Sequence, residues 1–171
     1  MWLRHLLSIA LLPFTVAVLV PIWIARRYGV EPAPGDGLLA WALQLAGLGL
    51  LGLGLVFFIA SLRRFASEGQ GTLAPWDPPR ALVVCGPYRY VRNPMISGVV
   101  WVLFGESLLL RSLPHAAWAA FFLALNLVYI PLIEEPQLER RFGAAYAEYC
   151  RNVPRVWPRL RPWTGPGPSR Q

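Results

Sequence analysis

Two long runs of this chain carry no charged side chain, and they constrain the fold more than any other feature. They cover residues 6–25 and 38–60, and each exceeds the roughly 18 residues that an α-helix needs to cross a bilayer. Two further apolar segments, 96–110 and 116–133, are joined by a short turn at 111–115. Hydrophobic residues make up 56% of the sequence, which is too high for an ordinary soluble domain. The sequence therefore predicts an all-α integral membrane bundle of four transmembrane helices.

The distribution of arginine predicts how the bundle is oriented. All sixteen basic residues are Arg, and 13 of them lie in the N-terminal stub, the loop after the second span and the C-terminal tail. Loops rich in basic residues stay on the cytoplasmic side. We therefore expect both termini in the cytoplasm, with the bundle in the inner membrane of a bacterium. Attraction to anionic membrane lipids accounts for the net charge of +7, so no nucleic-acid partner is expected.

Three other patterns favour a structural explanation. The glycines of GLGLLG, residues 47–52, match a dinucleotide-binding fingerprint, but they lie in the middle of an apolar helix and predict close helix packing instead. The first apolar run is too long for a secretory signal and lacks its cleavage pattern. Cys85 and Cys150 are both expected in the reducing cytoplasm, which predicts neither a disulfide nor a metal site.

The segment from Arg80 to Gly98, RALVVCGPYRYVRNPMISG, is a polar island between apolar segments. Pro94 suits the first turn of the third span, because its missing N–H would have no partner there. An antiparallel hairpin of the third and fourth spans would bring this point beside Glu134 and Glu135, at the end of the fourth span. Acids at a helix C-terminus oppose the helix dipole, which favours a functional reason for their presence.

The chain after the fourth span is expected to lie on the cytoplasmic surface. Apolar residues recur over 135–150 at offsets of four, three and four, which predicts an amphipathic helix. They are Leu138, Phe142, Ala145 and Tyr149. Pro, Arg and Trp alternate over 153–159, a composition suited to an extended chain at the level of the lipid headgroups. The last residues, 165–171, are expected to be disordered.

Two blocks of the sequence, GPYRYVRNPM and EEPQLERRFGAAYAEYCRNVPR, resemble the superfamily of isoprenylcysteine carboxyl methyltransferases and phospholipid N-methyltransferases. Its hallmark is GPY-x-x-x-RHP-x-Y followed by EE-x-x-L-x-x-x-FG-x-x-Y-x-x-Y. The likeness covers roughly residues 80–155. It implies a single membrane domain in which 80–98 and 134–158 bind S-adenosyl-L-methionine on the cytoplasmic side, and a lipophilic or small acceptor that enters from the bilayer.

The resemblance also implies roles for individual residues. Catalysis would involve Arg92, Asn93 and Glu134. An aromatic face favours a sulfonium cation, a glutamate can accept from ribose hydroxyls, and an arginine can pair with a carboxylate. Methyl transfer itself gains mostly from alignment and from exclusion of water. The implied cofactor-binding residues are Leu82, Val83, Gly86, Tyr88, Arg92, Asn93, Pro94, Gly98, Glu134 and Glu135.

Three positions depart from the superfamily's pattern. Asn93 replaces the usual His, Ile96 replaces the usual Tyr, and Ile130 stands where prenylcysteine enzymes place an Arg that engages the substrate carboxylate. Asparagine forms hydrogen bonds but cannot act as a general base. The departures predict an acceptor other than a prenylcysteine carboxylate. Asn93 and Ile96 also leave open a non-catalytic membrane protein that retains the fold. An NADPH-dependent membrane reductase stays open as well, because membrane sterol reductases resemble this superfamily in their C-terminal region.

Glu106 is an acid inside the third predicted span. A carboxylate is costly in lipid unless it faces the interior of the bundle or is protonated. Asn126 on the fourth span is a candidate partner, and a structural contact and a role in substrate binding remain equally open. The sequence does not indicate the oligomeric state.

Overall fold

The computed structural model describes residues 10–32, 37–68 and 81–165, and every regular element in these residues is helical. The predicted all-α class is thereby confirmed. The start of the first predicted span and most of the expected C-terminal disorder lie outside the described residues. In chain order the elements are the π-helix η1 (Ala10–Leu19), α2 (Val20–Tyr28), α3 (Leu38–Glu68), the 3-10 helix η2 (Gly86–Arg89), α4 (Pro94–Leu109), α5 (Leu113–Tyr129), the π-helix η3 (Ile130–Glu134) and α6 (Glu135–Asn152).

Two of the described helices are long and apolar enough to cross a membrane. They are α3 and the continuous helix of α5, η3 and α6, Leu113–Asn152. The 16 residues of α4 span about 24 Å at a rise of 1.5 Å per residue, less than the roughly 30 Å of a hydrocarbon core. The described residues therefore contain two candidate membrane spans, and the count of four stays a prediction.

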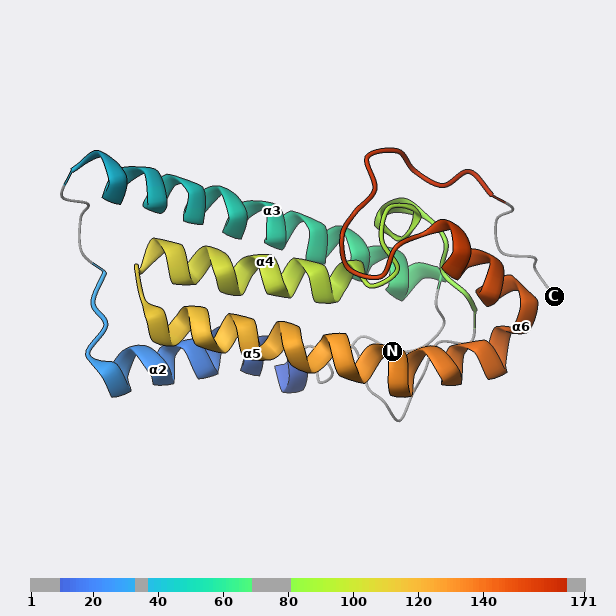
Figure 1. The fold of residues 1–171 in the computed structure, drawn as a ribbon, viewed down its shortest axis with the longest axis horizontal. Coiled ribbons are helices and arrows are strands. Elements are labelled where there is room, and N and C mark those ends of the chain that lie inside the picture. The colour runs from blue at the N-terminus through green and yellow to red at the C-terminus, as the bar shows by residue number, and fades with distance from the viewer. Residues whose placement is uncertain (1–9, 33–36, 69–80, 166–171) are drawn as a thin grey trace.

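The long helices lie side by side (Figure 1). α4 packs between α3 and α5, and α2 lies against α5. Pro94 begins α4, as the sequence predicts, and a short turn at Arg111, with φ of 50°, joins α4 to α5. At the opposite end of this hairpin η2, α6 and the C-terminal segment gather around the start of α4 (Figure 1).

α3 and α4 meet backbone against backbone along a line of small residues. A Cβ atom built on Gly47 would lie 2.8 Å from the carbonyl oxygen of Gly105, and one on Gly54 would lie 2.7 Å from that of Gly98. Both distances are shorter than real Cβ contacts, so only glycine fits. The buried small residues of α3 recur every seven positions: Ala40, Gly47, Gly54 and Ser61.

The GLGLLG motif is only partly a packing motif. Its first glycine, Gly47, lies in the contact with α4, but Gly49 and Gly52 have nothing within 4 Å of a built Cβ. The second packing glycine is Gly54, two residues beyond the motif. A repeat of seven keeps one face of a helix on its neighbour, whereas the closely spaced glycines of the motif point in different directions.

Glu134 and Glu135 do not end a helix, so the prediction based on the helix dipole is wrong. The chain stays helical past both residues, from Leu113 as far as Gly143. Pro131 cannot donate a helical hydrogen bond, and its ring crowds the preceding turn. The wider turn of η3 (Ile130–Glu134) surrounds this proline and lets the helix continue.

The helix that follows is broken at Gly143, whose φ of 54° and ψ of −130° are not helical. α6 therefore turns back toward the bundle instead of running on as one rod (Figure 1). The break shifts the phase of the predicted apolar stripe. Ala145, predicted to be in the stripe, is exposed, and Tyr146 is buried in its place beside Tyr149.

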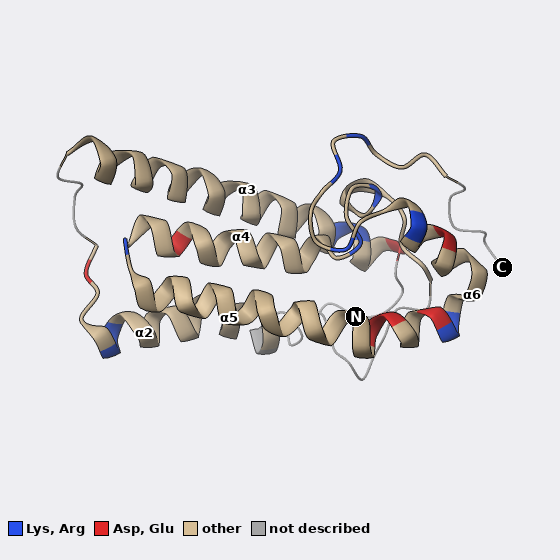
Figure 2. Ribbon diagram, viewed as in Figure 1, with Lys and Arg blue, Asp and Glu red and all other residues tan. Residues whose placement is uncertain are grey.

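Charged side chains gather at the end of the bundle that holds η2 and α6 (Figure 2). The opposite end carries a few arginines, at Arg26, Arg27 and Arg111. Glu106 lies three residues before the end of α4 at Leu109, in the half of the helix away from Pro94.

The structure does not pair Glu106 with Asn126. The amide of Asn126 donates to the carbonyl oxygen of Phe122 in its own helix at 2.8 Å. Counted from the turn at Arg111, the two residues lie five and fifteen positions away, which separates them by about 15 Å along the helices. One carboxylate oxygen of Glu106 is buried without a hydrogen-bond partner in the described structure.

Candidate functional site

The GPYRYVRNP run forms a tight turn that leads into α4. Gly86 adopts a φ of 54°, which favours glycine, and starts η2. Tyr88 points inward and is only 7% exposed. Asn93 precedes α4, where its carbonyl oxygen accepts from the backbone N–H of Ser97 at 3.0 Å. The turn therefore holds Tyr88 and the start of α4 in a fixed relation.

The extended segment 153–163, which we call the strap, crosses this turn. The strap is bonded to the turn mainly through backbone groups, so it restrains the turn whatever its own side chains are. Ser97 in the first turn of α4 also donates to the carbonyl oxygen of Val156 at 3.1 Å. The other bonds are Arg92 N to Pro154 O (2.8 Å), Arg159 N to Tyr90 O (3.0 Å), Trp163 N to Arg89 O (2.9 Å) and Arg89 Nε to Trp163 O (2.7 Å).

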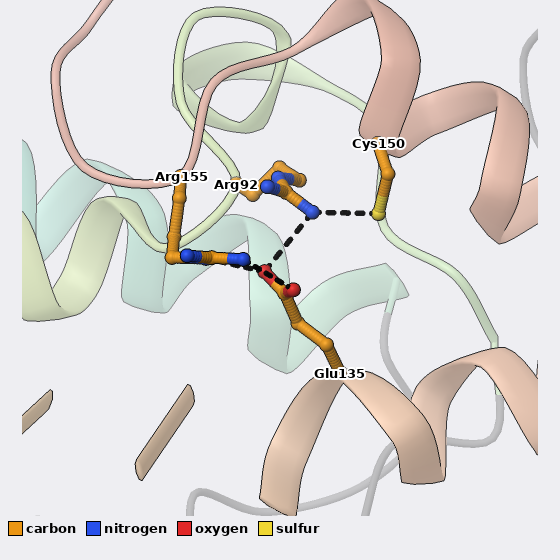
Figure 3. Close-up of polar contacts among 4 residues, drawn as sticks. All are labelled: Arg92, Glu135, Cys150 and Arg155. Carbon is orange, nitrogen blue, oxygen red and sulfur yellow. Dashed lines mark hydrogen bonds and ion pairs between the residues drawn. The ribbon is translucent and has the colours of Figure 1, made fainter. Parts of the chain in front are cut away.

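Glu135 joins the turn, α6 and the strap through ion pairs (Figure 3). Arg155 of the strap donates to both of its carboxylate oxygens at 2.7 Å, and Arg92 of the turn lies 3.0 Å from one of them. The Glu135 side chain is 15% exposed and that of Arg92 11%. The two-bond contact with Glu135 raises the pKa of Arg155 above its usual value. Glu135 is therefore shared between two arginines from different segments.

Cys150 on α6 completes this cluster. Its sulfur accepts from Nη1 of Arg92 at 2.6 Å (Figure 3). A cavity of about 350 Å³ opens beside the cluster. It is lined by Arg92, Glu135, Glu139, Tyr146, Ala147, Cys150 and Arg155.

Two buried polar atoms of the motif have no hydrogen-bond partner in the described structure: the hydroxyl of Tyr88 and Nε of Arg92. Burial, followed by the proximity of Tyr149, Cys85 and Glu134, raises the pKa of Tyr88 well above its usual value. The phenol therefore keeps its proton. Buried donors of this kind usually have a partner, so these two atoms mark a place where a polar ligand can bind.

α6 also holds the turn in place, through Tyr149. The hydroxyl of Tyr149 donates to the carbonyl oxygen of Tyr88 at 2.7 Å, and burial raises the pKa of Tyr149 above its usual value. Tyr149 packs with Val84 and Val153 in an apolar cluster. Tyr88 thus has its backbone fixed and its hydroxyl available.

The remaining sequence-predicted residues divide between two sides of the turn. Leu82 packs on the cluster around Tyr149, whereas the next residue, Val83, packs with Phe65 and Tyr88. Glu134 is half-buried, and its charge is the smallest of the contributions that raise the pKa of Tyr88. Of these residues, Val83 is the one that packs against Tyr88.

Gly98 is the predicted site residue that the structure places elsewhere. It lies in the contact between α3 and α4, where a Cβ would be 2.9 Å from the carbonyl oxygen of Gly54. Close packing explains this glycine, and none of its contacts supports a role in binding a cofactor.

Sequence reasoning missed the part that Arg155 and Cys150 play in the site. The sequence places Arg155 in an extended chain at the headgroup level and Cys150 at the end of an amphipathic helix, and it predicts no contact of either with Glu135 or Arg92. Arg155 is twenty residues from its partner Glu135, a separation with no secondary-structure period. The only available signal was that the superfamily likeness extends to residue 155.

Cys85 does not line the cavity, and its thiol forms a hydrogen bond with Glu68. Its thiol lies 2.8 Å from a carboxylate oxygen of Glu68. Burial, and then the bond to Glu68, raise the pKa of Cys85 to about 12. The thiol is therefore protonated and unreactive at physiological pH.

An all-helical chain with two membrane-length helices and a polar, buried site at one end of the bundle fits the class of membrane-embedded methyltransferases. A family model for phospholipid methyltransferases matches residues 43–145, from α3 into α6. Since this is more than half of the chain, the protein belongs to the phospholipid methyltransferase family, and the resemblance seen in its motifs is confirmed. No curated protein and no solved structure matches it. Membership favours methyl transfer over the reductase and non-catalytic alternatives.

Proposed function

We propose that this protein is a four-span membrane enzyme that transfers a methyl group from S-adenosylmethionine to a lipophilic or small acceptor at the cytoplasmic face. Family membership supports the reaction class. The observation that carries the location is that the Tyr88 hydroxyl and Arg92 Nε, both buried and unpartnered, come from one motif and lie at one end of the bundle. The gathering of arginines at this end supports the cytoplasmic face.

The residues present suit the chemical groups of S-adenosylmethionine. Arg92 can donate from Nε to a carboxylate while its Nη1 stays with Glu135 and Cys150. The protonated Tyr88 hydroxyl can donate to a polar group, and its ring offers a face to a cation. Glu134 supplies an acid near Tyr88, which favours a cationic sulfonium or a hydroxyl donor.

When bound, the cofactor would supply an activated methyl group, and the protein's part is to position and to exclude water. The strap fixes the turn that carries Tyr88 and Arg92 through several backbone bonds. Glu135 holds Arg92 in place from the opposite side. Asn93 offers no general base, so the acceptor must lose its proton, where it has one to lose, without help from this position.

Binding of S-adenosylhomocysteine, the demethylated cofactor, tests the proposal. We expect calorimetry on the detergent-purified protein to detect S-adenosylhomocysteine and not NADPH. Tyr88→Phe and Glu134→Gln should each weaken binding by about 10-fold or more, because a hydrogen bond to a charged or buried group contributes roughly 1.5–3 kcal/mol. Tyr28→Phe and Glu31→Gln, at exposed positions at the opposite end of the bundle, are the matched controls. Binding of NADPH alone, or equal affinity in all variants, would refute the assignment.

The acceptor is found by a separate measurement. The protein is incubated with methyl-labelled S-adenosylmethionine and host membrane extract, and the extract is separated into lipid and water-soluble fractions. We expect label in a lipophilic or small molecule, and we expect Glu134→Gln to reduce it. Label that appears only on protein would contradict this acceptor class.

A further inference from the structure

The strap exposes two large apolar side chains outside the membrane-length segments. Trp157 is 73% exposed and Leu160 is fully exposed. In the described chain beyond Ile133 these are the large hydrophobic residues that are exposed, and the others lie on η1, η3 and helices α2 to α5, or beside them. Exposed apolar groups on the membrane helices face lipid, so the same surroundings would account for the two on the strap.

The strap lies at the level where the membrane segment begins. Val156, next to Trp157, accepts from the hydroxyl of Ser97, which is in the first turn of α4. The apolar sequence of α4 starts at this turn. Figure 1 shows the strap beside the same end of the bundle, looping outward past α3. Trp157 is therefore held at the depth where tryptophan is enriched in membrane proteins.

Exposed positive charge accompanies the apolar pair. Arg161 is exposed one residue after Leu160, and Arg151 is exposed near the end of α6, just before the strap. Segments that combine aromatic and basic residues bind the boundary between headgroups and acyl chains, and anionic lipids strengthen the contact.

We propose that the strap docks on the anionic surface of the bilayer in which the protein sits. Trp157 and Leu160 enter the boundary between headgroups and acyl chains, and Arg151 and Arg161 contact lipid phosphates. Because the strap is bonded to the turn that carries Tyr88 and Arg92, the docked strap also anchors that turn at the membrane surface. The proposal depends on α3 and α5 crossing the membrane and not on the identity of the cofactor.

Tryptophan fluorescence in vesicles tests this docking. The full chain and its Trp157→Phe variant are reconstituted into vesicles of phosphatidylcholine, with or without phosphatidylglycerol, and their difference spectrum reports Trp157. We expect lipids brominated on the acyl chains to quench this emission, and acrylamide in the water to leave it largely unchanged. Trp41, 53% exposed on α3, is the control, measured in the same way with Trp41→Phe.

Each outcome decides part of the proposal. Quenching of Trp157 by acrylamide but not by brominated lipid would overturn the docking and indicate solvent or a protein partner instead. Phosphatidylglycerol should increase quenching by brominated lipid, and the double variant Arg151→Gln, Arg161→Gln should lose that increase. Equal quenching in the two lipid compositions would overturn the role of anionic headgroups.

Discussion

Replacing Gly54 by alanine should loosen the contact between α3 and α4, whereas the same change at Gly49 or Gly52 should not. A Cβ at Gly54 would lie 2.7 Å from the carbonyl oxygen of Gly98, and ordinary contact begins at 3.4 Å. The backbones must therefore separate by about 0.7 Å, the difference of those two distances. Gly49 and Gly52 have nothing within 4 Å of a new Cβ and need no movement.

The free energy of unfolding should separate the two kinds of site. Overpacking a tight contact costs about 1–3 kcal/mol. Alanine also favours a helix over glycine by about 1 kcal/mol, but this gain is common to all the variants and cancels in the comparison. For a chain of this size 1 kcal/mol shifts the melting temperature by about 2–4 °C. Gly54→Ala should thus melt about 2–12 °C below Gly49→Ala and Gly52→Ala.

Thermal unfolding in detergent, followed by the helical circular dichroism signal, measures this difference. Gly98→Ala, on the facing helix, should behave like Gly54→Ala because its Cβ would meet the same contact at 2.9 Å. Equal melting temperatures for the buried and the open glycines would refute the reasoning, since the backbones of α3 and α4 would then not be in contact.

Three further predictions concern the charged end of the bundle. Glu135→Gln should lower the free energy of unfolding by about 3 kcal/mol, because two arginines lose their shared partner and only Arg155 is as much as a third exposed. Glu139→Gln, at an exposed position, should have little effect. Denaturant titration measures both variants. Tyr149→Phe should cost about 1–3 kcal/mol in the same assay, because it leaves a buried carbonyl of the η2 turn without its donor. The folded-state pKa of Cys85 is raised to about 12 from the usual 9.0, which favours the neutral thiol. The contribution of this thiol to stability is therefore present below pH 9 and lost as the pH rises toward 12. Mass spectrometry should find slow alkylation of Cys85 at pH 9 in the folded chain and fast alkylation once the chain is unfolded.

Hydropathy and motif spacing could predict the helical class and the meeting of two distant segments. Both depend on local patterns: runs without charge, a proline at the start of α4 and a short turn that forces a hairpin. The pairing of Arg155 with Glu135 could not be predicted, because the strap has no secondary structure and its partners are set by backbone hydrogen bonds. Ion pairs between such segments leave no spacing in the sequence.

The ends and breaks of the helices could not be predicted from the sequence either. The end of the apolar run at Ile133 predicts the end of a helix, but hydropathy records where lipid ends and not where helical hydrogen bonds stop. The apolar stripe of α6 assumed an unbroken helix, and Gly143 interrupts it. A glycine in a helical pattern was the available warning.

The glycine line between α3 and α4 also restricts how a molecule dissolved in the bilayer can reach the site. Where two backbones touch, no rotamer change can open a passage, because there are no side chains to move. At the levels of Gly47 and Gly54 this wall is sealed unless the helices themselves part. A lipid-borne acceptor must therefore avoid these two levels of the α3 and α4 interface.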